Sequence, residues 1–135
     1  MAIGTIGGGR QLGDGNLNEL TLGVMPDPQT ATSTATLTVA QVTGGMLVAN
    51  PSTSAATYTF PTAAQLDAAL SNEKVGSTFD LVIVNLGTSS GVITMLVGTG
   101  WTIVGLATIA TTSSGSFTAR KTGDGAWALY RAVAP

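Results

Sequence analysis

The sequence predicts an all-β protein, a β-sandwich or jelly-roll-like domain with one short helix and an extended N-terminal arm. Short segments rich in Thr, Val and Ile are separated by Gly-rich turns, which is the pattern of short strands. Only one segment has helical periodicity. The chain has 135 residues, enough for a single domain with its own core.

The first 30 residues are predicted to form an arm in front of a domain at residues 31–135. Glycines at 7–9 make the arm costly to order, and Pro26-Asp27-Pro28 marks its end. The arm still carries apolar residues, so we expect it to order by docking on another protein. The alternatives are a frayed terminus or an edge strand at 20–24. The proposed arm contacts are Leu12, Leu17, Leu20 and Leu22.

The first half of the domain alternates apolar and hydroxyl side chains over 34–41, which predicts a strand. Short strands at 46–49 and 57–60 follow. The one predicted helix covers 62–72, because Thr62 and Gln65 fit a capping box ahead of an apolar stripe. We expect this helix to cover one end of the sandwich.

The second half contains the most apolar strands. In the strand at 78–86, Leu81 and Ile83 face one side, whereas Val82 and Val84 face the other. A strand that is apolar on both faces must be covered on both faces, here by the helix or by another subunit. Val82 and Val84 are therefore candidate interface residues. Further strands are expected at 92–97, 101–104, 106–109, 116–122 and 126–133, the last two joined by a turn at Gly123–Gly125.

Charge is scarce throughout the chain. Charged residues make up 9% of the sequence, against about 25% in a typical soluble domain. A surface so poor in charge favours assembly, and the alternative is a monomer solvated by Thr, Ser, Asn and Gln. With five basic residues and a net charge of −2, the chain is not expected to bind nucleic acid. The apolar tract 92–110 is rich in β-branched residues and glycine, so no membrane span is expected.

Each candidate motif for catalysis or metal binding lacks a residue that the motif requires. Gly87-Thr-Ser-Ser-Gly91 has the letters of a hydrolase elbow, but the chain contains no histidine to act as base, so a hairpin loop is predicted. A calcium-like run from Asp14 has Glu19 and Met25 where the loop needs Gly and Glu. There is no cysteine. We therefore expect no enzyme activity, no cofactor and no metal.

Two remaining groups of residues have ordinary structural explanations. Asp80 lies mid-strand, where solvation or a pair with Arg120 or Lys121 is expected rather than catalysis. Four aromatic residues could in principle form a sugar-stacking platform, but core or interface positions are more common for such side chains. These are Tyr58, Trp101, Trp127 and Tyr130.

A family resemblance runs through residues 46–133. The tracts Thr57-Tyr-Thr-Phe-Pro-Thr-Ala-Ala-Gln-Leu-Asp-Ala-Ala-Leu70, Gly98-Thr-Gly-Trp-Thr-Ile-Val-Gly105 and Trp127-Ala-Leu-Tyr-Arg131 resemble the capsid decoration (cement) proteins of tailed bacteriophages. The resemblance implies a homotrimer on the outer surface of the virion, bound to the major capsid protein and bridging capsomers, with no catalytic residues. A fibre or glycan-binding receptor module and a tail or baseplate component remain alternatives.

Overall fold

The computed structural model describes residues 22–133, which form a β-rich fold with two sheets and two short helices. The helices are α1 (Val39–Thr43) and α2 (Ala63–Ala69), and neither is long enough to cross a membrane. The strands are β1 (Gln29–Ala31), β2 (Ala35–Thr36), β3 (Met46–Ala49), β4 (Ala56–Thr59), β5 (Thr78–Asn85), β6 (Ile93–Leu96), β7 (Trp101–Val104), β8 (Thr108–Ile109), β9 (Ser113–Gly123) and β10 (Ala126–Val133).

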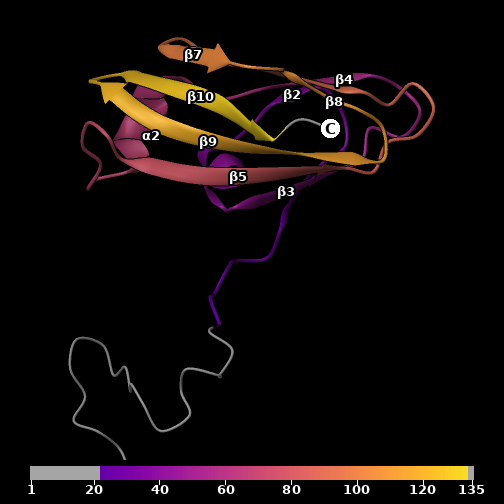
Figure 1. Cartoon of the computed structure of the whole chain (residues 1–135), viewed down its shortest axis with the longest axis horizontal. Coiled ribbons are helices and arrows are strands. Elements are labelled where there is room, and N and C mark those ends of the chain that lie inside the picture. The colour runs from indigo at the N-terminus through magenta and orange to yellow at the C-terminus, as the bar shows by residue number, and fades with distance from the viewer. Residues whose placement is uncertain (1–21, 134–135) are drawn as a thin grey trace, which may run out of the picture.

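The chain winds alternately through the two sheets. The six-stranded sheet has the order β1-β3-β5-β9-β10-β7, and the four-stranded sheet has the order β2-β4-β6-β8. Successive strands from β1 to β6 alternate between the sheets, so β1, β3 and β5 pair in parallel, as do β2, β4 and β6. The long β9–β10 hairpin is antiparallel and extends the larger sheet towards its far edge, β7 (Figure 1).

One hydrophobic core lies between the sheets. The larger sheet contributes Leu47, Leu81, Ile83, Phe117 and Leu129, and the smaller sheet contributes Tyr58, Ile93, Met95 and Ile109. Every second residue of β5 is buried from Leu81 onwards, as its period-two sequence pattern requires. Three aromatic rings pack in a row: Phe60 meets Trp101 edge to face with centroids 5.3 Å apart, and Trp101 lies tilted against Trp127 with centroids 5.8 Å apart.

The strand predicted over 34–41 is wrong beyond its first residues. Only Ala35 and Thr36 pair in β2, and the chain then forms α1. The cause is local: the Thr38 side chain accepts a hydrogen bond from the Gln41 backbone N–H, while the Gln41 side chain accepts one from the Thr38 N–H. This capping box satisfies two helix-end donors and outweighs the alternating pattern.

The helix predicted at 62–72 is confirmed as α2. Its capping box is formed by Thr62 and Gln65, and it buries Ala63 and Leu66. Figure 1 shows α2 at one end of the molecule, next to the turn that joins β9 and β10. The segment before it is held by the Trp101 indole, which donates to the Pro61 carbonyl at 2.9 Å.

The Gly87–Gly91 segment is a loop, but it does not join a hairpin. It connects β5 of one sheet with β6 of the other. An added Cβ at Gly91 would meet the Ser52 carbonyl oxygen at 2.4 Å, so only glycine allows this close approach of two backbones. The segment therefore serves packing between the sheets.

Candidate protein interface

The structure brings together two of the predicted interface residues, Val82 and Val84. Both point away from the core and are half-buried on the outer face of β5. Parallel pairing places Met46 beside Val82 and Val48 beside Val84, and these β3 side chains are also half-buried. The outer face of β3 and β5 therefore carries a four-residue apolar patch.

The predicted arm contacts are only partly within the structure. Leu12, Leu17 and Leu20 lie outside the described residues. Leu22 is described and is 79% exposed, so it does not pack against the domain of its own chain. Figure 1 shows residues 22–28 running away from the sheets. Val24, an apolar residue of the arm that was not among the predicted contacts, shares this segment and is fully exposed.

A second apolar surface was also missed by sequence reasoning. It consists of four exposed side chains on β6, β7, the β7–β8 connection and β10, called here the apolar edge. Val104 and Tyr130 are register partners in the β7–β10 pairing, so their side chains are neighbours. The members of the apolar edge are Leu96, Val104, Leu106 and Tyr130.

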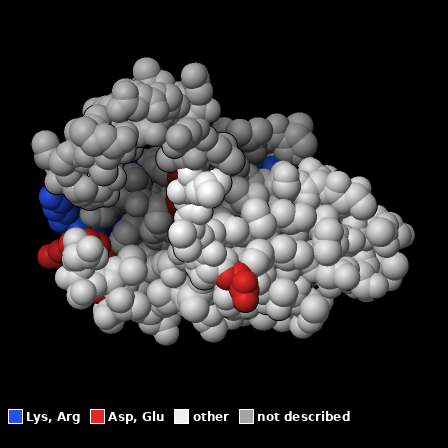
Figure 2. All heavy atoms as spheres, turned by 90° about the horizontal axis from the view of Figure 1, so that it is seen from below, with Lys and Arg blue, Asp and Glu red and all other residues white. Residues whose placement is uncertain are grey.

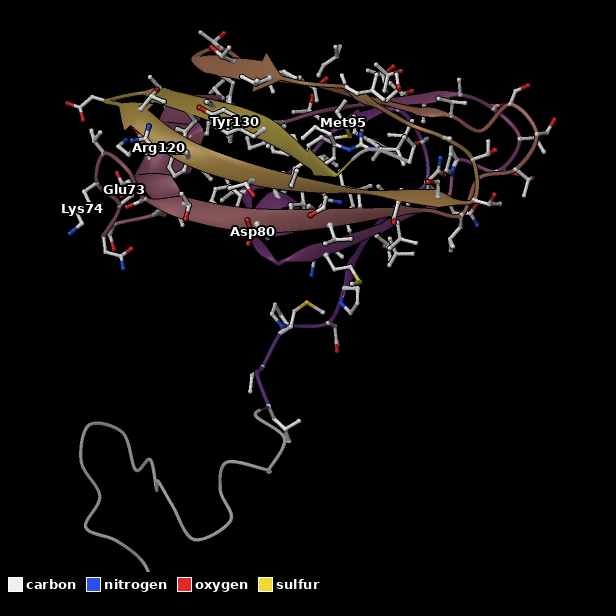
Figure 3. The ribbon with its side chains drawn as sticks, in the orientation of Figure 1. Glu73, Lys74, Asp80, Met95, Arg120 and Tyr130 are labelled. Carbon is white, nitrogen blue, oxygen red and sulfur yellow. The ribbon has the colours of Figure 1, made fainter. Side chains whose placement is uncertain are left out.

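The apolar edge is continuous from one sheet to the other. The Met95 N–H donates to the Ala107 carbonyl at 2.8 Å, which places Leu96 and Leu106 opposite each other one residue further along. Leu106 lies two residues after Val104, across the bend at Gly105, whose φ is +101°. Figure 3 shows Tyr130 on β10, next to β7. This surface therefore wraps around the side of the molecule where both sheets end.

Arg131 fixes the backbone beneath the apolar edge. Its Nη1 donates to the Leu106 carbonyl at 3.2 Å and to the Thr108 carbonyl at 2.9 Å. Its guanidinium also stacks over the Phe117 ring, 5.0 Å from the centroid. The β7–β8 connection is thus held from below, while its apolar side chains face outwards.

The buried charges lie where α2 meets the β9–β10 turn. Lys121 is 3% exposed, and its Nζ lies 2.7 Å from Asp67 Oδ2 on α2. The other Asp67 oxygen accepts from the Trp127 indole at 2.8 Å, and Oδ2 also accepts from the Gly125 N–H at 2.8 Å. Glu73 lies 3.9 Å from the same ammonium. These contacts, called here the hairpin-end network, bind α2 to the β9–β10 turn.

The hairpin-end network controls the ionisation of Asp67. Burial alone would raise the pKa of this carboxyl, but hydrogen bonds from Lys121, Trp127 and Gly125 stabilise its charged form. The net result is a pKa below the ordinary value of 3.8. Because every polar atom of Asp67 has a fixed donor, this carboxylate is a structural group rather than a proton donor for chemistry.

Of the two expectations for Asp80, an exposed position or a pair with Arg120 or Lys121, the structure shows the exposed position. Its carboxylate accepts a hydrogen bond from the Thr118 hydroxyl at 2.8 Å, and the nearby cation Lys121 is taken by Asp67. The side chains of Lys121 and Asp80 lie on opposite faces of the sheet. Asp80 is in register with Thr118 of β9, and Lys121, three residues further along the same strand, points to the buried face. Asp80 is exposed and solvated (Figure 3).

Clusters of metal-ligating side chains and hollows are the features of residues 22–133 that bear on metal binding and catalysis. These residues contain no cluster of three acidic, His or Cys side chains that could hold a metal. The hollows are shallow; one of about 330 Å³ lies beside Glu73, Phe79 and Trp127. Figure 2 shows charged groups gathered mainly at one end of the visible face, with a broad uncharged area beside them.

Comparisons with known proteins do not assign the chain to a family. No family model, no curated protein and no solved structure matches it. The functional argument therefore depends on the surfaces and contacts described above.

Proposed function

We propose that the chain is a virion structural protein, a capsid decoration protein that binds the outer surface of a phage shell as a homotrimer. The observation that carries the proposal is the pairing of an uncharged apolar surface with an apolar segment that leaves its own domain. Leu22 and Val24 extend from one side, and the apolar edge lies on another. Such surfaces favour burial against neighbouring protein chains.

The fold supports a stabilising role rather than chemistry. Two sheets around one core are consistent with a β-sandwich, a rigid platform for surface contacts. The charged groups that could serve catalysis hold α2 and the β9–β10 turn together instead. In the proposed mechanism, apolar faces that include Val82 and Val84 pack between subunits, at about 25 cal/mol per Å² of apolar area buried.

The arm supplies the second kind of contact. Leu12, Leu17, Leu20 and Leu22 bind neighbouring chains of the shell, including the major capsid protein. A trimer presents three arms at once, so weak individual contacts combine into tight attachment. Trimers that bridge capsomers in this way stiffen the shell against the pressure of packaged DNA.

The rival function is a glycan-binding fibre module. Such a site needs exposed aromatic faces on which a sugar ring can stack. Trp101, Trp127 and Tyr58 are buried in the core, and the Trp101 indole already donates to Pro61. Tyr130 is the remaining member of that set with an exposed ring. The buried aromatics therefore favour decoration over glycan binding.

Co-sedimentation tests the proposal directly. The full chain is mixed with empty expanded heads assembled from the major capsid protein encoded in the same genome. We expect saturable binding that deletion of residues 1–22 weakens, with the truncated protein still folded by circular dichroism. A full-length chain that stays in the supernatant overturns the proposal, and a truncated chain that binds equally well overturns the role of the arm.

A further inference from the structure

The segment at residues 22–24 has the properties of a strand without a sheet. It belongs to no helix or strand, and Leu22 and Val24 are 79% and 102% exposed with Gly23 between them. The alternation continues back to Leu20 in the sequence. A period-two apolar segment of this kind is stabilised when its backbone pairs with a sheet edge and its side chains are covered.

The β7 strand has the complementary properties. It is the last strand of the six-stranded sheet, and within residues 22–133 it pairs only with β10. Its outward edge therefore carries backbone N–H and C=O groups without strand partners. Val104 and Tyr130 stand next to that edge and are exposed, so an added strand with apolar side chains would find apolar neighbours.

The segment at residues 22–24 of one chain cannot reach the β7 edge of that same chain. The arm joins β1, and β1 and β7 are the two opposite edges of the same sheet. Five strand spacings of about 4.8 Å separate them, roughly 24 Å. Only residues 25–28 connect Val24 to β1, and fully extended they span about 17 Å. Figure 1 shows residues 22–28 leaving the sheets on the side away from β7.

We propose that the Leu20–Val24 segment of one chain adds as a strand to the β7 edge of a second copy. The prolines at 26 and 28 favour this exchange, because they hold the connection extended and keep it from folding back onto β1. A donor at one edge and an acceptor at the other make the contact heterologous, and such contacts close into a ring when the rotation between successive copies is a whole fraction of a turn. The proposal deepens the trimer of the proposed function and leaves Leu12 and Leu17 for the capsid.

Disulfide trapping tests the exchange, since the natural chain contains no cysteine. One protein carries Leu22→Cys, and a second, differently tagged protein carries Val104→Cys or Thr102→Cys. After mixing, subunit exchange and mild oxidation, we expect roughly tenfold more linked heterodimer than with a Ser90→Cys acceptor in the exposed β5–β6 loop. Absence of any excess over the Ser90→Cys control overturns the proposal.

Proline substitution provides an independent readout. Adjacent residues of a strand point their N–H groups to opposite sides, so either Leu22→Pro or Gly23→Pro must remove a donor that faces β7. An added Cβ at Gly23 meets nothing within 4 Å, so the subunit itself is expected to fold normally. We expect one of the two variants to lose the oligomer, while Leu22→Ala weakens it less; two intact oligomers contradict the exchange.

These outcomes are separable from those of the proposed function. A trapped oligomer that does not bind heads supports the exchange and rejects decoration. Head binding by a chain that gives no trapped link supports decoration and rejects the exchange. A double variant with both Leu22→Cys and Val104→Cys that forms only an intramolecular link shows self-pairing and also rejects the exchange.

Discussion

The hairpin-end network and the apolar edge satisfy their surfaces in different ways. At the hairpin end, Lys121 and Asp67 are buried together, and both Asp67 oxygens receive hydrogen bonds from the chain itself. At the apolar edge, Val104, Leu106 and Tyr130 are exposed, and Arg131 holds the backbone from beneath. The hairpin-end network is complete within the chain, whereas the apolar edge presents side chains that residues 22–133 do not bury.

This difference indicates where the stability of the subunit and the stability of an assembly come from. Polar contacts at the hairpin end act within the subunit, so changes there should lower the free energy of unfolding without altering association. Apolar side chains at the edge gain little within the subunit, so changes there should alter association and leave unfolding almost untouched. The first and last of the following predictions test the hairpin-end network, the two between them test other buried polar groups of the subunit, and the closing measurement tests the apolar edge.

The largest effect is expected from Asp67→Ala. This change leaves the Lys121 ammonium buried without its 2.7 Å partner and removes the acceptor of the Trp127 indole. Breaking one side of a buried ion pair lowers the free energy of unfolding by about 3 kcal/mol. Urea unfolding measures it, with Asp27→Ala as the matched control because Asp27 is exposed. Equal midpoints for the two variants would show that the hairpin-end network contributes nothing.

The second effect is expected from Asn85→Ala. The Asn85 amide donates to the carbonyls of Gly91 and Ala110 at 2.9 and 3.0 Å, and its oxygen accepts from the Gly87 N–H at 2.8 Å. Truncation leaves these buried groups unpaired, at a cost of about 2 kcal/mol. Thermal unfolding of Asn85→Ala should show a lower midpoint than that of Asn72→Ala, where the side chain is exposed.

A smaller, stabilising effect is expected from Tyr58→Phe. The Tyr58 hydroxyl is fully buried and has no hydrogen-bond partner within residues 22–133. Removing an unpaired buried hydroxyl should raise the free energy of unfolding by about 1 kcal/mol. The exposed Tyr130→Phe serves as control. A destabilised Tyr58→Phe protein would reveal that the hydroxyl is bonded.

The smallest effect is the pH dependence contributed by Asp67. Its pKa in the folded chain is lower than the ordinary 3.8, so its stabilising contribution is complete above that value. The contribution is then lost as the pH falls through the folded pKa. Unfolding curves between pH 5 and pH 2 should therefore slope more steeply for the natural chain than for Asp67→Asn. Parallel slopes would contradict the assigned shift.

Much of the fold could be predicted because the signals are local. The capping box at Thr62 and the period-two pattern of β5 each involve neighbouring residues, and both predictions are confirmed. A local signal also explains one error: the equivalent box at Thr38 ends β2 early. The parallel pairing of β1 with β3 and of β2 with β4 could not be predicted, because it joins segments distant in sequence.

The candidate interface was predicted only in part for the same reason. Val82 and Val84 follow from alternation within one strand. The apolar edge does not, because its members come from separate strands that meet only through sheet order. A useful signal was nevertheless present: Val104 and Leu106 are apolar on both sides of Gly105, where the chain bends between sheets.

Sedimentation equilibrium of the full-length chain tests the central claim most directly. The account predicts a discrete oligomer, most simply a trimer, that dissociates when Val104→Ser and Leu106→Ser are combined, while the unfolding midpoint of the subunit stays nearly unchanged. A natural chain that sediments as a monomer at micromolar concentration would contradict the claim that its apolar edge is completed by another copy.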